Sequence, residues 1–198
     1  MSRISKVVFN VDNWTRVTGT AQTGIQVIHE KRGNYNFGLE EWNNCQILKK
    51  HKLAYLDSFR SFNRSGCFEN IELINFYNHT VYHIGTLKGV RVIASEEIEK
   101  IRNTLINENW LKIVEQDFQQ IQDLRLIEKH TEYMRCWHSN EIVAGVNQGF
   151  VLNIRYDEMI YFDEPRNLTL QDERVNLRWR RLVHLYRVRN EFQNLFSL

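Results

Sequence analysis

Three short segments combine a large aromatic ring with nearby amide, hydroxyl or carboxylate side chains, and these residue types together suit a pocket for a flat base. The segments are Asn13–Arg16, Phe37–Asn44 and Tyr55–Arg64. Rings stack on the two faces of a base, while the polar groups hydrogen-bond to its edge. We therefore predict a pocket in which aromatic rings hold a flipped base. The rings are Trp14, Trp42 and Tyr55, and the groups that read the base edge are Asn43, Asp57 and Ser58.

Basic side chains near these segments are the candidates for holding the phosphates outside the pocket. They are Lys31, Arg32, Arg60 and Arg64. Phosphate contacts supply affinity and position the protein, but they carry no sequence information. A second basic feature is the stretch from Arg174 to Arg189, which contains six arginines. It fits a nucleic-acid contact, a solvated face or a contact with a neighbouring domain equally well.

Core packing is the competing interpretation for each aromatic ring, because aromatic side chains mostly bury apolar surface. Trp110 is the clearest case. It recurs at helical spacing with Ile106, Ile113 and Val114, so we expect it on the buried face of a helix.

The sequence carries no short motif of a catalytic class. It contains no GxxxxGK[ST], GxGxxG, GxSxG or HExxH, and no Asp or Glu stands two residues before a lysine, as in restriction-type nucleases. We therefore predict that the chain is not an enzyme. Two alternatives to a nucleic-acid-binding module remain open. One is a divergent metal-dependent nuclease that uses Asp57, Glu69 and Glu72, and the other is a protein-interaction module with an aromatic docking surface.

The richest cluster of candidate metal ligands is His130, Cys136 and His138, with Cys45 or Cys67 as a fourth ligand. This spacing matches no common zinc scheme, so we expect no metal and no other cofactor. The three cysteines form no CxxC pair, which indicates reduced thiols and not a disulfide framework.

The overall composition is that of a folded globular chain. Of the 198 residues, 42% are hydrophobic and 25% are charged, and the net charge is only +2. Any nucleic-acid site must therefore be a local patch. There is no apolar signal-peptide stretch at the start and no run of about 18 apolar residues, so we expect a soluble, cytoplasmic protein that does not enter a membrane.

The periodicity of apolar residues predicts an α+β fold. Alternating or β-branched runs predict strands, in chain order, at 6–11, 22–28, 53–59, 71–77, 80–84, 90–93 and 150–156. Helical spacing predicts one or two helices over 95–128, starting with Ser95 as cap, and another helix over 172–196. This order favours a curled antiparallel or mixed β-sheet, or a small β-barrel, with packed helices and a C-terminal helix.

The best candidate for a joint between two parts of the chain is the stretch 163–171, which contains Pro165. We therefore predict a binding domain over 1–162 and a helical extension over 163–198.

The order of the segments resembles that of PUA-like domains of the EVE and YTH kind. Val7–Trp14 resembles their opening strand, and Glu41–Asn44 stands where they carry a Trp- and Asn-bearing segment beside the ligand pocket. Leu53–Ser58 is similar to a barrel strand of these domains, and Val81–Val92 is similar to a strand with an aromatic residue, a glycine and a β-branched run. The resemblance covers about residues 5–160.

The resemblance implies a function, and the chain departs from the family at three places. Asp12-Asn13 replaces a Lys-Ser pair, the helical block is longer, and the C-terminal helix is additional. Domains of this kind bind modified bases in RNA or DNA, and bacterial versions sense modified DNA in restriction systems. The resemblance therefore implies a reader of a modified base, with DNA favoured over RNA and a nuclease or motor as partner.

Overall fold

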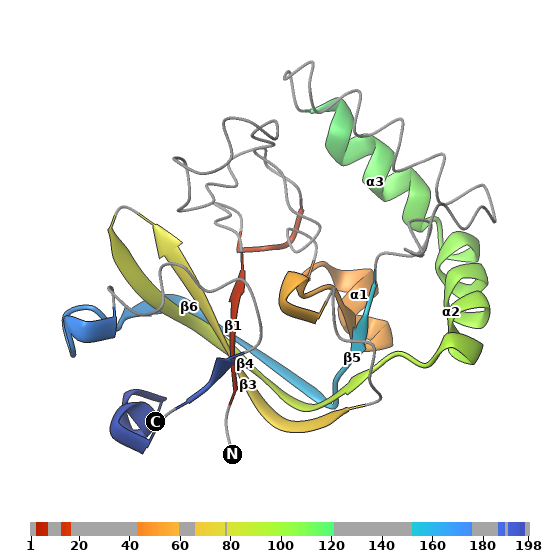
Figure 1. Cartoon of the computed structure of the whole chain (residues 1–198). Coiled ribbons are helices and arrows are strands. Elements are labelled where there is room, and N and C mark those ends of the chain that lie inside the picture. Colours follow the sequence, from red (N-terminus) through yellow and green to blue (C-terminus); the bar gives the residue numbers. More distant parts are fainter. Residues whose placement is uncertain are drawn as a thin grey trace, which may run out of the picture.

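The longest strand among the described residues, β4 (Thr80–Val92), is hydrogen-bonded along both of its edges. The computed structural model describes residues 3–7, 13–16, 43–59, 66–77, 79–120, 152–175, 186–188 and 190–196. β3 (Cys67–Tyr77) pairs antiparallel with one edge of β4. The other edge pairs with β6 (Glu158–Asn167) and, nearer the end of β4, with β5 (Ile154–Arg155). β4 is therefore the centre of the sheet (Figure 1).

Three further strands complete the seven-stranded mixed sheet of the described residues. β1 (Arg3–Val7) runs parallel to β3, and β7 (Tyr186–Arg187) pairs antiparallel with β1. β2 (Leu53–Ala54) pairs antiparallel with β5. The strand order is β2-β5-β4-β3-β1-β7, with β6 beside β4. The predicted α+β class with a mixed sheet is confirmed, but the sheet is open, because β2 and β7 end it without pairing with each other.

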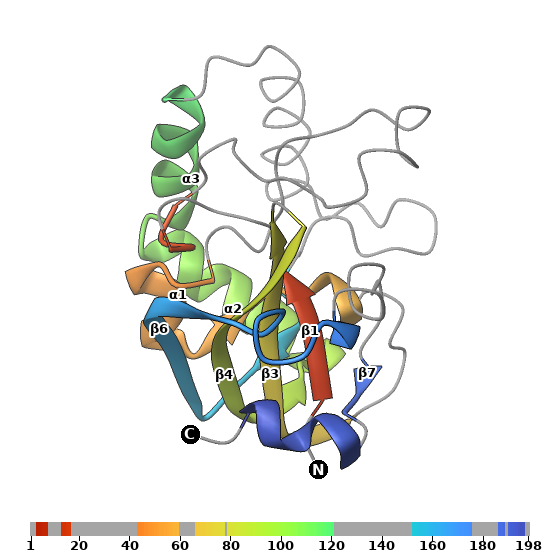
Figure 2. The ribbon, with the colours of Figure 1, turned by 90° about the vertical axis from the view of Figure 1, so that its left-hand side faces the viewer.

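The helical block predicted over 95–128 is two helices in the part of the chain that the structure describes. α2 (Ser95–Asn107) and α3 (Trp110–Gln119) are separated at Asn109, whose positive φ of 63° cannot continue a right-handed helix. The short helix α1 (Gln46–His51) contributes to the same core cluster as these two. Figures 1 and 2 show the three helices grouped on one side of the molecule, away from the C-terminal segment.

Two predicted strands are much shorter in the structure. The strand predicted at 53–59 is only the two-residue β2, followed by the 3₁₀ helix η2 (Asp57–Phe59). The strand predicted at 150–156 is only β5 over its described part. β2 ends early because asparagine side chains, not a neighbouring strand, bind the backbone at the next two residues. The strand predicted at 22–28 lies outside the described residues.

The predicted C-terminal helix over 172–196 is also wrong over its described part. Arg174 and Val175 are helical, but β7 is a strand and Asn190–Phe196 is the 3₁₀ helix η3. The edge of β1 supplies backbone partners to β7, and these hydrogen bonds replace those of a continuing helix. The stretch 163–171, where we predicted a joint, overlaps β6, which belongs to the central sheet.

Buried side chains in the described ranges form three clusters. The first joins α1, α2 and α3 and contains Trp110, which is 1% exposed and is therefore a core residue, as predicted. The second includes Trp14 and the inner residues of β3 and β4. The third lies where η3 packs on the sheet and contains Phe192.

Two glycines allow β6 and the residue before it, Asp157, to approach one edge of β4 closely. At Gly85, a Cβ atom would lie 2.1 Å from the backbone oxygen of Ile160 in β6. At Gly89, whose φ is +59°, a Cβ atom would lie 1.9 Å from Oδ2 of Asp157. Both positions therefore require a residue without a side chain.

We expect Gly85→Ala to lower the free energy of unfolding by about 1–3 kcal/mol, because the β6 backbone must move to accommodate the methyl group. Gly89→Ala should also destabilise, but its obstacle is a side chain. Adding Asp157→Ala should therefore recover part of the Gly89→Ala loss, whereas adding Ile160→Ala should recover none of the Gly85→Ala loss. Urea denaturation measures all four variants, and equal recovery at both sites would contradict this account.

Glu97 joins the start of α2 to β4 and β5. Its carboxylate accepts hydrogen bonds from Arg91 at 2.7 and 3.1 Å, and it lies 3.4 Å from Nε of Arg155. It also accepts a hydrogen bond from the backbone N–H of Ala94 at 3.3 Å, and Ala94, not the predicted Ser95, is the N-cap. The hydrogen-bonded Arg91 guanidinium is the main reason that the pKa of Glu97 falls to about 2.

The lowered pKa of Glu97 predicts a pH-dependent contribution to stability. The charged carboxylate stabilises the fold above its ordinary pKa of 4.5, and this contribution is lost as the pH falls toward about 2. Glu97→Gln should therefore lower Tm by up to about 2–4 °C near pH 7 and change it little near pH 2. Glu99→Gln, on an exposed position of the same helix, is the control for both pH values. A Tm loss of the same size at both pH values in thermal denaturation would refute the charge-based explanation.

Candidate functional site

Asn44 holds the turn at residues 13–16 against the start of α1. Its backbone N–H donates to the carbonyl of Trp14 at 2.7 Å, and its Nδ2 donates to the carbonyl of Asn13 at 2.9 Å. Asn13 and Trp14 have positive φ angles of 50° and 59°, a conformation that is costly for a bulky residue. The two hydrogen bonds from Asn44 therefore stabilise a turn that the local sequence alone disfavours.

Two asparagine side chains bind the backbone immediately after β2. The N–H of Tyr55 donates to Oδ1 of Asn43 at 2.8 Å, and Nδ2 of Asn43 donates to the carbonyl of Tyr55 at 2.6 Å. Asn153 binds the N–H and the carbonyl of Leu56 in the same way, at 2.9 and 2.8 Å. Successive residues of an extended chain direct their backbone groups to opposite sides. The two asparagines therefore act as substitute strand neighbours, one on each side.

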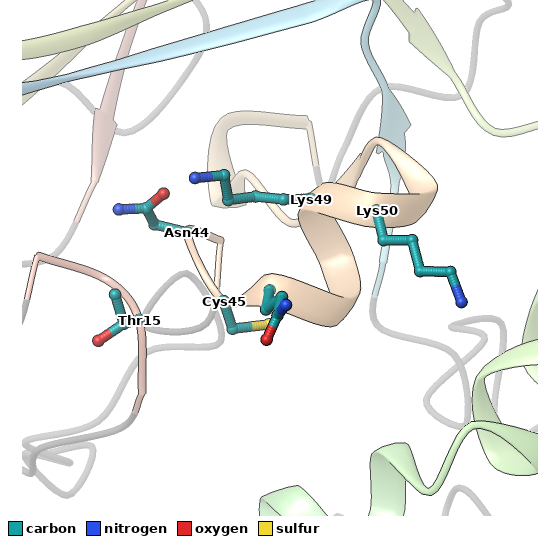
Figure 3. Close-up of a pocket in the computed structure, with 6 residues that line it drawn as sticks. Thr15, Asn44, Cys45, Lys49 and Lys50 are labelled. Carbon is teal, nitrogen blue, oxygen red and sulfur yellow. The ribbon is translucent and has the colours of Figure 1, made fainter.

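An open hollow of about 590 Å³ lies between the turn at residues 13–16 and α1. Its lining residues are Thr15, Asn44, Cys45, Gln46, Lys49 and Lys50. Figure 3 shows the side chain of Asn44 and the amine of Lys49 on the side of α1 that faces Thr15, whereas the amine of Lys50 points the other way. The hollow thus presents hydroxyl, amide and ammonium groups, which are the groups that bind phosphates and the edges of bases.

The end of α1 carries four consecutive basic residues, Lys49-Lys50-His51-Lys52, here called the basic run. Nζ of Lys50 lies 2.8 Å from one carboxylate oxygen of Glu108, and Nε2 of His51 lies 2.9 Å from the other. Lys49 is exposed and forms no ion pair within the described ranges. Our sequence reasoning missed the basic run, although four basic residues in a row are a visible signal.

Burial keeps the side chains of Cys45 and Tyr156 uncharged at neutral pH. Burial of Cys45, which is 5% exposed, raises the pKa of its thiol to about 12, so the thiolate is almost absent. Burial, with a smaller effect of Cys45, also raises the pKa of Tyr156. The hydroxyl of Tyr156 is buried and has no hydrogen-bond partner in the described part of the chain.

The two described rings of the predicted aromatic cage are both buried. Trp14 is 4% exposed and stacks on Tyr161 with a centroid distance of 5.4 Å, while Tyr55 is 9% exposed and belongs to a different core cluster. Neither ring lines the hollow. The described parts of the three segments that we predicted to form the pocket do lie together. They are joined by hydrogen bonds of Asn43 and Asn44 to the backbone and not by the aromatic rings. The core-packing interpretation therefore holds for Trp14 and Tyr55.

The remaining predicted base-reading and phosphate-binding residues are either engaged elsewhere or not described. Asn43 is bound to Tyr55, and Oγ of Ser58 is hydrogen-bonded to Oγ of Ser5 at 2.7 Å, so both side chains are buried and already bonded. The other predicted groups lie outside the described residues: Trp42, the side chain of Asp57, Lys31, Arg32, Arg60 and Arg64.

The glutamates of the alternative nuclease site do not face one another. Glu69 is exposed and Glu72 is buried, and the two stand on opposite faces of β3. Oε2 of Glu72 lies 3.1 Å from Nε2 of His83 and accepts a hydrogen bond from Thr86 at 2.7 Å. Within the described ranges, no group of His, Cys, Asp and Glu could hold a metal ion. The cluster that we considered for zinc, with His130, Cys136 and His138, lies outside those ranges.

Comparison of the chain with family models, curated proteins and solved structures finds no match. The resemblance to PUA-like domains therefore stays a prediction. Among the helices of the described ranges, none has the length and apolar character that crossing a membrane requires.

We expect Cys45 of the folded protein to react with iodoacetamide near pH 8 at least about 100-fold more slowly than Cys67, because its raised pKa leaves little thiolate. Cys67 is exposed and serves as the internal control. Mass spectrometry of the alkylated peptides follows both sites, and the two rates should converge in urea. Rapid alkylation of Cys45 in the folded protein would show that its thiol is accessible and ionised.

Proposed function

We propose that this chain binds nucleic acid, with the basic run on the phosphate backbone and a base received by the hollow. The observation that carries the proposal is that Lys49 and Lys50 belong to the basic run and also line the hollow. A base in the hollow would therefore bring a flanking phosphate next to the amine of Lys49, while the amine of Lys50, which points the other way (Figure 3), is placed for a further phosphate. Such contacts supply most of the affinity of proteins for nucleic acids.

The uncharged lining of the hollow suits the polar edge of a base. The hydroxyl of Thr15 and the amides of Asn44 and Gln46 can each donate or accept hydrogen bonds. Because one N–H of Asn44 Nδ2 is bound to Asn13, its Oδ1 and its second N–H are the groups that can read a base. No carboxylate is among the described lining residues, so nothing in that lining repels a phosphate.

More specifically, we propose that the chain recognises a modified base in DNA and serves a restriction system together with a nuclease or motor. The resemblance to EVE and YTH domains supports this more specific proposal. Trp14 and Tyr55 are buried, so Trp42, next to Asn43 in the sequence, becomes the candidate for stacking. Flipping a base costs a few kcal/mol and stacking on one ring returns roughly 1–3 kcal/mol, so the amides of the hollow must contribute as well.

We expect Lys49→Gln to weaken binding to short duplexes about 3- to 10-fold and to reduce the slope of log K against log salt by about 1, because one phosphate contact is lost. The loss should be equal for modified and unmodified duplexes, since a phosphate contact does not read the base. Fluorescence anisotropy over a series of salt concentrations, with DNA and RNA oligonucleotides, measures both quantities.

The matched control for this experiment is Lys100→Gln, which removes the same charge from an exposed position on α2. This control should leave affinity and salt slope almost unchanged. Equal losses in the two variants would mean that only net charge matters and that α1 is not the contact. A chain that binds no oligonucleotide at low salt would overturn the proposed function and favour a protein-interaction module.

A further inference from the structure

Glu108 binds two members of the basic run at once. Its Oε1 accepts a hydrogen bond from Nζ of Lys50 at 2.8 Å, and its Oε2 lies 2.9 Å from Nε2 of His51. Glu108 directly follows the last residue of α2, so this contact joins α1 to the turn between α2 and α3. The side chains of Glu108 and Lys50 are 30% and 63% exposed, so a ligand from solvent can reach the contact.

The contact with Glu108 engages Lys50 and His51 but leaves Lys49 without a carboxylate partner in the described part of the chain. The hydrogen bond from Lys50, followed by the contact with His51, lowers the pKa of Glu108, which keeps the carboxylate charged at neutral pH. Lys50 and His51 therefore face an internal anion. Lys49 has no such counter-ion in the described part of the chain, and its amine points away from that of Lys50 (Figure 3).

A carboxylate and a phosphate can both pair with an ammonium group, since both offer anionic oxygen acceptors. A phosphate near Lys50 must therefore compete with Glu108. A free anion gains only this one contact when it displaces the carboxylate. A nucleic acid gains more, because it also contacts Lys49 and places a base in the hollow.

We propose that Glu108 is an internal competitor for the phosphate backbone, an autoinhibitory contact that a nucleic acid must displace before Lys50 can bind it. This inference rests on the proposed function of the basic run and the hollow. It deepens that function, because Glu108 weakens the binding of anions that engage Lys50 alone and so favours ligands that fill the hollow as well. Displacement also breaks the polar link between α1 and the turn after α2, while the core cluster that the helices share stays in place.

The test is the substitution Glu108→Gln, which keeps the shape of the side chain and removes its charge. The variant should bind a duplex about 2- to 5-fold more tightly than the natural chain, the gain expected when one exposed ion pair no longer competes. Its salt slope should steepen by up to about 1, because in the natural chain the displaced Glu108 carboxylate takes up a cation and so offsets part of the cation release from the phosphates. Fluorescence anisotropy with the full chain measures both changes.

The matched control is Glu99→Gln, which makes the same change of net charge on the same helix. Glu99 is exposed and lies about 13 Å along α2 from Glu108, beyond the range of unscreened interactions at physiological salt. A second control places Glu108→Gln in a Lys50→Gln background. There the gain in affinity should largely disappear, because the residue that Glu108 blocks is already absent.

Each outcome decides between the explanations. Equal gains in affinity for Glu108→Gln and Glu99→Gln would show an effect of net charge alone. Weaker duplex binding by Glu108→Gln would show that Glu108 only holds α1 in place. Either result overturns the inference. If the natural chain binds no oligonucleotide, tripolyphosphate is the second probe, with binding followed by NMR shifts of α1. Tighter tripolyphosphate binding by Glu108→Gln would preserve the competition while the proposed function fails, and no binding would reject both.

Discussion

The candidate site depends on two asparagine side chains that replace β-strand neighbours. Asn43 binds both backbone groups of Tyr55, and Asn153 binds both backbone groups of Leu56. A buried backbone N–H or carbonyl without a partner costs free energy, so these four hydrogen bonds are what allow the sheet to end at β2. Since Asn43 is fixed in this way, the next residue, Asn44, is placed where it can hold the turn at residues 13–16.

Asn153 also connects the segment after β2 to the centre of the sheet through its own backbone. Its backbone N–H donates to the carbonyl of Ala54 at 3.2 Å, and its own carbonyl accepts from the N–H of Ile93 at 3.0 Å. Ile93 directly follows β4, whose edge pairs with β5 and β6 and approaches β6 at Gly85 at a distance that only glycine permits. The position of α1 beside the hollow therefore depends on packing at β4, far away in the sequence.

The sequence predicts those elements whose side chains repeat regularly, and it fails where single polar side chains decide. Alternation along β3 and the apolar spacing of α2 are local properties, so both elements are found where they were expected. By contrast, β2 stops because Asn43 and Asn153 bind the following backbone, and no periodic pattern encodes that. The contribution of the aromatic rings to a binding pocket was overestimated for a related reason. An aromatic residue beside an asparagine gives the same sequence pattern whether its ring is exposed or buried, as that of Trp14 is.

The electrostatics of the site show why a net charge of +2 says little about an anion site. At physiological salt, charges more than about 8 Å apart are largely screened, so only the groups next to the basic run matter. There, Glu108 contacts Lys50 and His51, which lie 58 and 57 residues before it in the sequence. Lys49 has no carboxylate partner in the described structure. If this surface binds phosphate as we propose, its affinity is set largely by one carboxylate that folding brings to it. Neither the composition of the chain nor the run of basic residues alone reveals that balance.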